Sequence, residues 1–111
     1  MILYGRQWID EEDINAVIDV LKGDWITQGP KIDEFEKALA NYCGAKYAVA
    51  VNSGTSALHL ACLAAGIKEG DEVITTPITF VASANCVVYC GGIPVFADIN
   101  KDTYNIDPSE I

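Results

Sequence analysis

The sequence predicts an α/β fold built on a parallel β-sheet. Three short apolar segments have the character of strands, residues 47–51, 72–75 and 93–97, and two segments between them that of helices, 54–65 and 80–90. Strands that alternate with helices at this spacing indicate βαβ units with right-handed crossovers. The strands are apolar almost throughout, as in a sheet with both faces covered. We therefore expect a three-layer αβα arrangement around a parallel βαβαβ core.

Composition limits the classes of partner. The net charge of the 111 residues is −9, and no basic stripe is present, so we expect neither nucleic acid nor an anionic membrane as a partner. The four cysteines form no CxxC pair and only one histidine accompanies them, so we expect no metal site and reduced thiols. The N-terminus lacks the pattern of a signal peptide, and a cytoplasmic protein is expected.

Two amphipathic helices are predicted ahead of the sheet. The first begins after Asp10, which is suited to cap it, and ends at Gly23. The second begins at Pro30 and ends near Gly44. On each helix the apolar residues recur at the spacing of one face, which predicts burial of that face. These residues are Ile14, Val17, Ile18 and Leu21 on the first helix, and Ile32, Phe35, Leu39 and Tyr42 on the second.

The turn at residues 52–56, Asn-Ser-Gly-Thr-Ser, follows a predicted strand and opens a nearly all-apolar helix. Free N–H groups at a helix start, a glycine that permits close approach and hydroxyl donors together suit a phosphate, so Gly54, Thr55 and Ser56 are candidate ligands. Ordinary N-capping by Ser53 explains the same residues equally well. The turn is neither a P-loop nor a dinucleotide-binding GxGxxG motif.

Three further residues have a functional and a structural interpretation. Phe80 follows Pro77 at the carboxyl edge of the sheet, where an aromatic ring could stack on a flat ligand, but one phenylalanine in an apolar helix is more often core. Asp98 follows the last strand and is expected to cap a turn. His59 is expected to be structural, because no serine or cysteine nucleophile is evidently paired with it.

Several segments together resemble one family. NSGTSALHLA, GDEVITTPITFVASANCVVYCGGIPVFADI and NIDPSEI, with ILYGRQWIDEEDI and WITQGPKIDEFEKALANYCG before them, are similar to the DegT/DnrJ/EryC1/StrS sugar aminotransferases. These are pyridoxal 5'-phosphate (PLP) enzymes of fold type I. YGRQWIDEEDI and TTPITFVASAN most resemble members that act on a UDP-4-keto-6-deoxy-N-acetylhexosamine in the pseudaminic acid pathway. The resemblance implies an arm and first helix at residues 1–30 and a truncated, incomplete PLP-binding large domain at 31–111.

The resemblance also implies residue roles. Gly54, Thr55 and Ser56 would hold the PLP phosphate, and Phe80 would stack on the pyridine ring. Tyr4 and the loop at 27–29, with Thr27 and Gln28, would lie near the substrate. No catalytic residue is assigned, because the lysine that forms the aldimine with PLP would lie beyond residue 111. A UDP-sugar, glutamate as amino donor and a homodimer or higher oligomer are the implied partners.

Alternatives remain at this point. A sugar dehydratase of the same family lacks the lysine, and a stand-alone α/β module could bind a phosphorylated ligand by itself. For the 111 residues alone we expect no transaminase activity. The resemblance places the strand at 47–51 away from an adjacent pair, 72–75 and 93–97. The unpaired edges predict that the isolated chain either self-associates or pairs its strands in another order.

Overall fold

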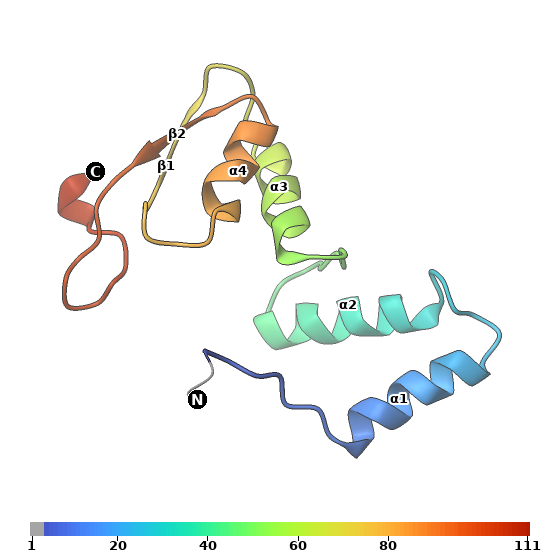
Figure 1. Ribbon diagram of the computed structural model, residues 1–111. Coiled ribbons are helices and arrows are strands. Elements are labelled where there is room, and N and C mark those ends of the chain that lie inside the picture. The colour runs from blue at the N-terminus through green and yellow to red at the C-terminus, as the bar shows by residue number, and fades with distance from the viewer. Residues whose placement is uncertain (1–3) are drawn as a thin grey trace. The chain divides into compact units, whose positions relative to one another are not determined.

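A computed structural model describes residues 4–111 (Figure 1). Its elements are α1 (Glu11–Lys22), α2 (Pro30–Cys43), α3 (Gly54–Ala64), β1 (Glu72–Thr75), α4 (Ala82–Tyr89), β2 (Ile93–Phe96) and the 3₁₀ turn η1 (Pro108–Glu110). The chain divides into two compact units whose residues contact mainly one another, Met1–Ala50 and Val51–Ile111. The expected division into an arm with the first helix at 1–30 and part of a large domain at 31–111 concerns a family-length protein, and it stays a prediction.

The second unit contains a parallel βαβ arrangement. β1 and β2 pair in parallel, with Glu72 opposite Ile93, and α4, which connects them, packs on both strands. α3 lies beside α4 (Figure 1). The buried apolar side chains of this unit are on α4 and just after β2: Ala82, Cys86, Val87 and Ala97. The predicted α/β class with a parallel sheet is confirmed, and so is the adjacency of the two strands. The described residues therefore give no sign of another strand order.

The predicted strand at residues 47–51 is not formed, so the sheet has two strands instead of three. The side chains still alternate, with Ala48 and Ala50 half-buried and Val49 exposed between them, which is the pattern of an extended chain. A strand also needs a hydrogen-bonding neighbour, and no strand of residues 4–111 lies beside this segment. The prediction was wrong because apolar alternation does not supply that neighbour.

The predicted ends of α1 and α2 are confirmed. The Asp10 carboxylate accepts the N–H groups of Glu12 at 3.0 Å and Asp13 at 3.2 Å, and the Asp13 carboxylate accepts the Asp10 N–H at 3.1 Å. This reciprocal capping box satisfies amides that a helix start leaves without partners. α2 ends at Gly44, which has a φ of 65° that a glycine adopts without strain.

The prediction of buried apolar helix faces is wrong. The four stripe residues of α1 are 36–61% exposed, and those of α2 are exposed as well. The nearly all-apolar helix α3 has no buried residue either. Periodicity identifies the apolar face of a helix, but burial requires surfaces that cover that face, and periodicity does not specify them. None of the helices described combines the length and hydrophobicity needed to cross a lipid bilayer.

Candidate functional site

A hollow in the second unit brings separated candidate residues together. It has a volume of about 670 Å³, and Gly54 and Thr55 line it together with Phe80. The rest of the lining consists of Ala57, Leu58, Ala61, Ala82 and Ser83. The hollow thus lies between the start of α3 and the segment that leads into α4. No acidic or basic side chain contributes to this lining.

The start of α3 is capped by its own side chains. Ser53 Oγ accepts the Ser56 N–H at 3.2 Å, which confirms the capping interpretation. The Ser56 hydroxyl donates to Asn52 Oδ1 at 2.7 Å and lies 3.0 Å from Ser53 Oγ. Ser56 does not line the hollow. Of the three candidate phosphate ligands on this helix, the structure therefore brings Gly54 and Thr55 to the hollow, while the Ser56 hydroxyl is engaged within the turn.

Capping leaves donors available at the same helix start. Gly54 and Thr55 are the first two residues of α3, and an α-helix has no internal carbonyl for amides at these positions. The N-terminal end of a helix also carries partial positive charge. A methyl group built on Gly54 would meet nothing within 4 Å, so the glycine leaves open space beside the donors. This arrangement fits an anion the size of a phosphate.

Phe80 supplies an aromatic surface to the lining of the hollow. Its side chain is 73% exposed, so the core interpretation fails for this residue in the described structure. A ring that borders a hollow beside an anion site fits a flat aromatic ligand that carries a phosphate, as PLP does. Ser83 also lines the hollow, with its Oγ 3.2 Å from Thr79 Oγ1, and the sequence interpretation missed it. Its position at the start of a helix three residues after Phe80 was the available signal.

The candidate substrate residues lie in the first unit. Gln28 and Trp25 line a cavity of about 250 Å³ at the loop between α1 and α2, whereas Tyr4 and Thr27 do not line it. Gln28 has a φ of 47°, a left-handed conformation that is unfavourable for this residue type. A methyl group on Gly29 would lie 2.7 Å from Trp25 Cβ, so the loop requires glycine there. Tyr4 is fully exposed.

The remaining candidates have structural roles. The Asp98 carboxylate accepts the N–H of the next residue, Ile99, at 2.7 Å, and capping of a turn by Asp98 stays a prediction. His59 contacts Tyr89 edge to face, with 5.3 Å between ring centroids. Within residues 4–111, no group of histidine, cysteine and acidic residues is arranged to hold a metal ion.

All four cysteines are free thiols. Cys86 is buried and its thiol donates to the Ser83 carbonyl at 3.4 Å, Cys62 and Cys90 are half-buried, and Cys43 is exposed. Burial raises the pKa of the Cys62 thiol, and the neighbouring sulfur atoms of Cys86 and Cys90 raise it further. Of the four, Cys86 alone is fully buried. That the thiols are reduced in the cell stays a prediction.

Comparison with known proteins supports the same chemistry. Residues 7–111 match the DegT/DnrJ/EryC1/StrS aminotransferase family. The UDP-4-amino-4,6-dideoxy-N-acetyl-beta-L-altrosamine transaminase of Campylobacter jejuni is 50% identical over 111 residues, which is 100% of this chain and 29% of the relative.

Two solved structures resemble the fold closely. Helicobacter pylori PseC, an aminotransferase involved in the biosynthesis of pseudoaminic acid, is 43% identical with a TM-score of 0.87, over 95% of this chain and 29% of that one. NtdA from Bacillus subtilis with bound cofactor PMP is 41% identical with a TM-score of 0.82, over 88% of this chain and 22% of that one. The chain thus spans less than a third of each relative. From the match over residues 7–111, this chain belongs to the DegT/DnrJ/EryC1/StrS aminotransferase family.

Proposed function

We propose that the chain provides the cofactor-phosphate part of a PLP-dependent nucleotide-sugar aminotransferase of fold type I and of family length. The observation that carries the proposal is the hollow that Gly54, Thr55 and Phe80 line together. The related NtdA structure, which contains PMP, supports the choice of cofactor. The corresponding domain assignment is an arm and first helix at residues 1–30 and part of the PLP-binding large domain at 31–111.

The residues of the hollow hold and orient the cofactor. The N–H groups of Gly54 and Thr55 donate to the phosphate, and the Thr55 hydroxyl is a further donor. Ser56 joins them if its hydroxyl leaves Asn52 when the phosphate binds. Phe80 packs on the face of the pyridine ring and fixes its plane. When bound, PLP supplies the electron sink that allows an amino group to pass between an amino acid and a carbonyl compound.

The proposed substrates are glutamate, as amino donor, and the 4-keto carbon of a UDP-4-keto-6-deoxy-N-acetylhexosamine. The relatives from Campylobacter jejuni and Helicobacter pylori support this substrate class. Tyr4, Thr27 and Gln28 are the proposed substrate residues, and the constrained backbone at Gln28 suits a residue with a fixed role. A cytoplasmic homodimer or higher oligomer completes the proposal.

The 111-residue chain by itself is proposed to be inactive. Its lysines are Lys22, Lys31, Lys37, Lys46, Lys68 and Lys101. Among the residues that the structure describes, none of these lines the hollow. Transamination with PLP needs a lysine amine at the cofactor, and this chain offers none at the proposed site.

The test uses Gly54→Ala in the family-length protein. The added methyl meets no atom of residues 4–111 within 4 Å, so stability of this part should not fall. The methyl occupies the space proposed for the phosphate. We expect PLP affinity to fall at least tenfold, measured by the absorbance of bound cofactor. Thr55→Val should weaken binding less, because it removes only the hydroxyl.

Gly5→Ala is the matched control, since a methyl at Gly5 also meets nothing within 4 Å and lies outside the hollow. Unchanged PLP affinity in Gly54→Ala would contradict the proposed phosphate site. A separate assay with glutamate and the UDP-4-keto sugar tests the substrate: cofactor binding without formation of the amino sugar would refute the substrate alone.

A further inference from the structure

The chain after α2 folds back along that helix. Gly44 reverses its direction, and the Ala45 N–H donates to the Ala40 carbonyl at 2.9 Å. Ala40 is buried, and together with Tyr47 and Ala48 it lines a small hollow between α2 and the returning segment. The segment at residues 47–50 therefore runs beside α2 within the first unit.

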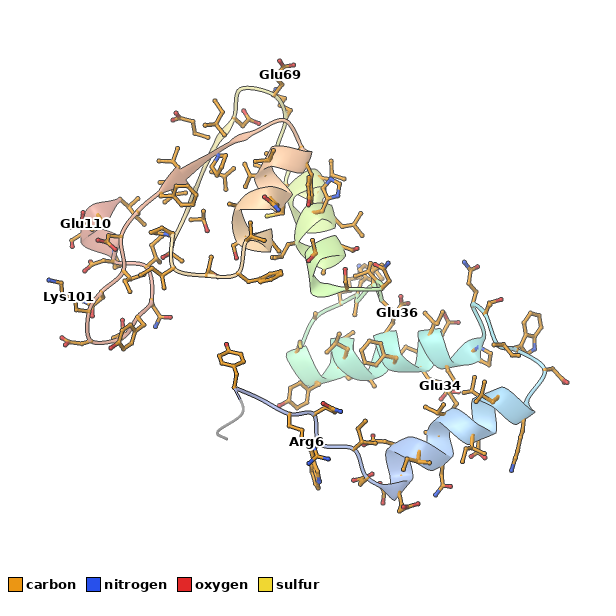
Figure 2. All side chains as sticks on the ribbon, in the orientation of Figure 1. Arg6, Glu34, Glu36, Glu69, Lys101 and Glu110 are labelled. Atoms are coloured by element: carbon orange, nitrogen blue, oxygen red, sulfur yellow. The ribbon has the colours of Figure 1, made fainter. Side chains whose placement is uncertain are left out.

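One side chain of α2 binds the main chain of this segment. Glu36 Oε1 accepts the Ala50 N–H at 2.7 Å, across 14 positions of sequence. Figure 2 labels Glu36 and Glu34 on α2. Glu36 is half-buried, unlike Glu34, which is exposed and pairs with Lys31. A short hydrogen bond from an amide to a carboxylate is stronger than one between neutral groups. The contact therefore fixes the amide of Ala50 on the α2 side.

In an extended chain, successive N–H groups point to opposite edges. The exposure of the side chains alternates from Tyr47 to Ala50, which indicates such a conformation. Because Glu36 holds the Ala50 N–H, the N–H groups of Tyr47 and Val49 point to the other edge. Both of these side chains are about three-quarters exposed (75% and 74%).

We propose that Glu36 is an edge guard: its carboxylate takes the place of a neighbouring strand at Ala50, so that a β-strand can pair with this segment only along the edge of Tyr47 and Val49. Open strand edges are prone to pair with other chains, and a charged side chain turned toward an edge is one way of blocking it. The guard also restricts the register of pairing, because a strand on that edge can hydrogen-bond only to alternate residues.

The strand that pairs there belongs to the remainder of a family-length polypeptide. This occupant rests on the proposed function, since the chain spans only 29% of its Campylobacter jejuni relative. A second copy of this chain fits less well, because each copy carries a net charge of −9 and the copies repel one another. A strand of the same polypeptide also avoids the entropy lost in association.

Amide hydrogen exchange on the 111-residue chain tests the guard. In the unmodified chain the Ala50 amide is protected, while the amides of Tyr47 and Val49 exchange freely. Glu36→Ala should accelerate Ala50 exchange at least tenfold, because the charge-assisted bond is lost. Glu36→Gln keeps an acceptor oxygen and should retain most of the protection. Glu34→Ala, on the same helix, should leave Ala50 unchanged. Exchange at Ala50 that is insensitive to Glu36→Ala would overturn the proposal.

The occupant is tested by the same measurement on the family-length protein. We expect Val49 to become protected there, while protection of Ala50 still depends on Glu36. If Ala50 stays protected in Glu36→Ala of that protein, a strand occupies the guarded edge and the proposal fails. If Val49 becomes protected with rising concentration of the 111-residue chain, the occupant is a second copy. Neither failure bears on PLP affinity, because neither Glu36 nor Val49 lines the hollow of the second unit.

Discussion

Gly92 lies so close to Val87 that a methyl group on its Cα would approach Val87 Cγ1 to 2.9 Å. The same methyl would lie 3.1 Å from the Asp71 carbonyl oxygen and from Ile67 Cγ2. Val87 is 1% exposed and cannot move aside easily. The Gly92 N–H also donates to the Val87 carbonyl at 3.0 Å, and this turn carries the chain from α4 into β2.

Gly92→Ala should therefore destabilise the second unit. Overpacking of this kind costs about 1–3 kcal/mol, measured as the loss in the free energy of unfolding in urea by circular dichroism. Gly5→Ala is the control, because a methyl at Gly5 meets nothing within 4 Å. Equal unfolding midpoints for the two variants would contradict the prediction, because they would mean that the turn accommodates a methyl group at Gly92 without a clash.

Two substitutions of Ser53 separate capping from phosphate binding. Ser53→Ala removes the acceptor of the Ser56 N–H and should lower stability by about 1 kcal/mol. Ser53→Asp restores a capping oxygen and should recover that stability. It also places a negative charge beside the proposed phosphate site, so PLP affinity of the family-length protein should fall at least tenfold. A Ser53→Asp protein that binds PLP normally would argue against an anion at this helix start.

Asp107 should make its loop sensitive to acid. The side-chain hydrogen bond from Ser109, its backbone N–H and, more weakly, Asn100 hold the pKa of the Asp107 carboxyl below its ordinary value of 3.8. The stabilisation of the folded state is thus fully present above that value and is lost as the pH falls through the lowered pKa.

The measurement is an NMR titration of the Asp107 carboxyl carbon. In Ser109→Ala the side-chain bond of 2.7 Å is lost, and the pKa should rise toward 3.8, while the backbone bond of 2.9 Å retains part of the effect. Thr103→Ala is the control: Thr103 lies in the same loop but makes no hydrogen bond to Asp107, so the pKa of Asp107 should not change. A pKa that is equal in Ser109→Ala and in the unmodified chain would contradict the assignment.

Three of the four cysteines should react with iodoacetamide in a set order. Cys43 is exposed and should be alkylated first. Cys62 should follow slowly, because its raised pKa leaves little thiolate near pH 8. Buried Cys86 should react only when the second unit unfolds. Peptide mass spectrometry of timed samples gives the order, and early labelling of Cys86 would mean that α4 leaves the sheet readily.

The 111-residue chain should neither transaminate nor bind PLP with measurable heat. The hollow is open, and no lysine of residues 4–111 lines it. Isothermal titration with PLP and an absorbance scan for a cofactor band are the two measurements. Saturable binding would favour the alternative of a stand-alone module for phosphorylated ligands. Turnover would contradict the assignment of the reactive lysine to another part of the protein.

Much of the local structure was predictable. The capping carboxylate of Asp10, the reversal at Gly44 and both paired strands follow from residue types that favour one backbone conformation. The juxtaposition of Thr55 and Phe80 was predictable only through the family resemblance, because periodicity cannot say which turns of the chain meet. The engagement of the Ser56 hydroxyl by Asn52, and the position of Ser83 at the hollow, required coordinates.

The sequence by itself determined where helices begin and end, which segments are apolar and which family the motifs resemble, since these depend on neighbours along the chain. Tertiary structure decided which apolar surfaces are buried. Val87 is buried because β1 and β2 lie against α4, whereas the apolar stripe of α1 stays exposed in the described structure of residues 4–111. It also decided that residues 47–51 form no strand, and that Glu36 holds the Ala50 amide. Burial and strand pairing each need a second surface, and a residue's own sequence neighbours do not specify one.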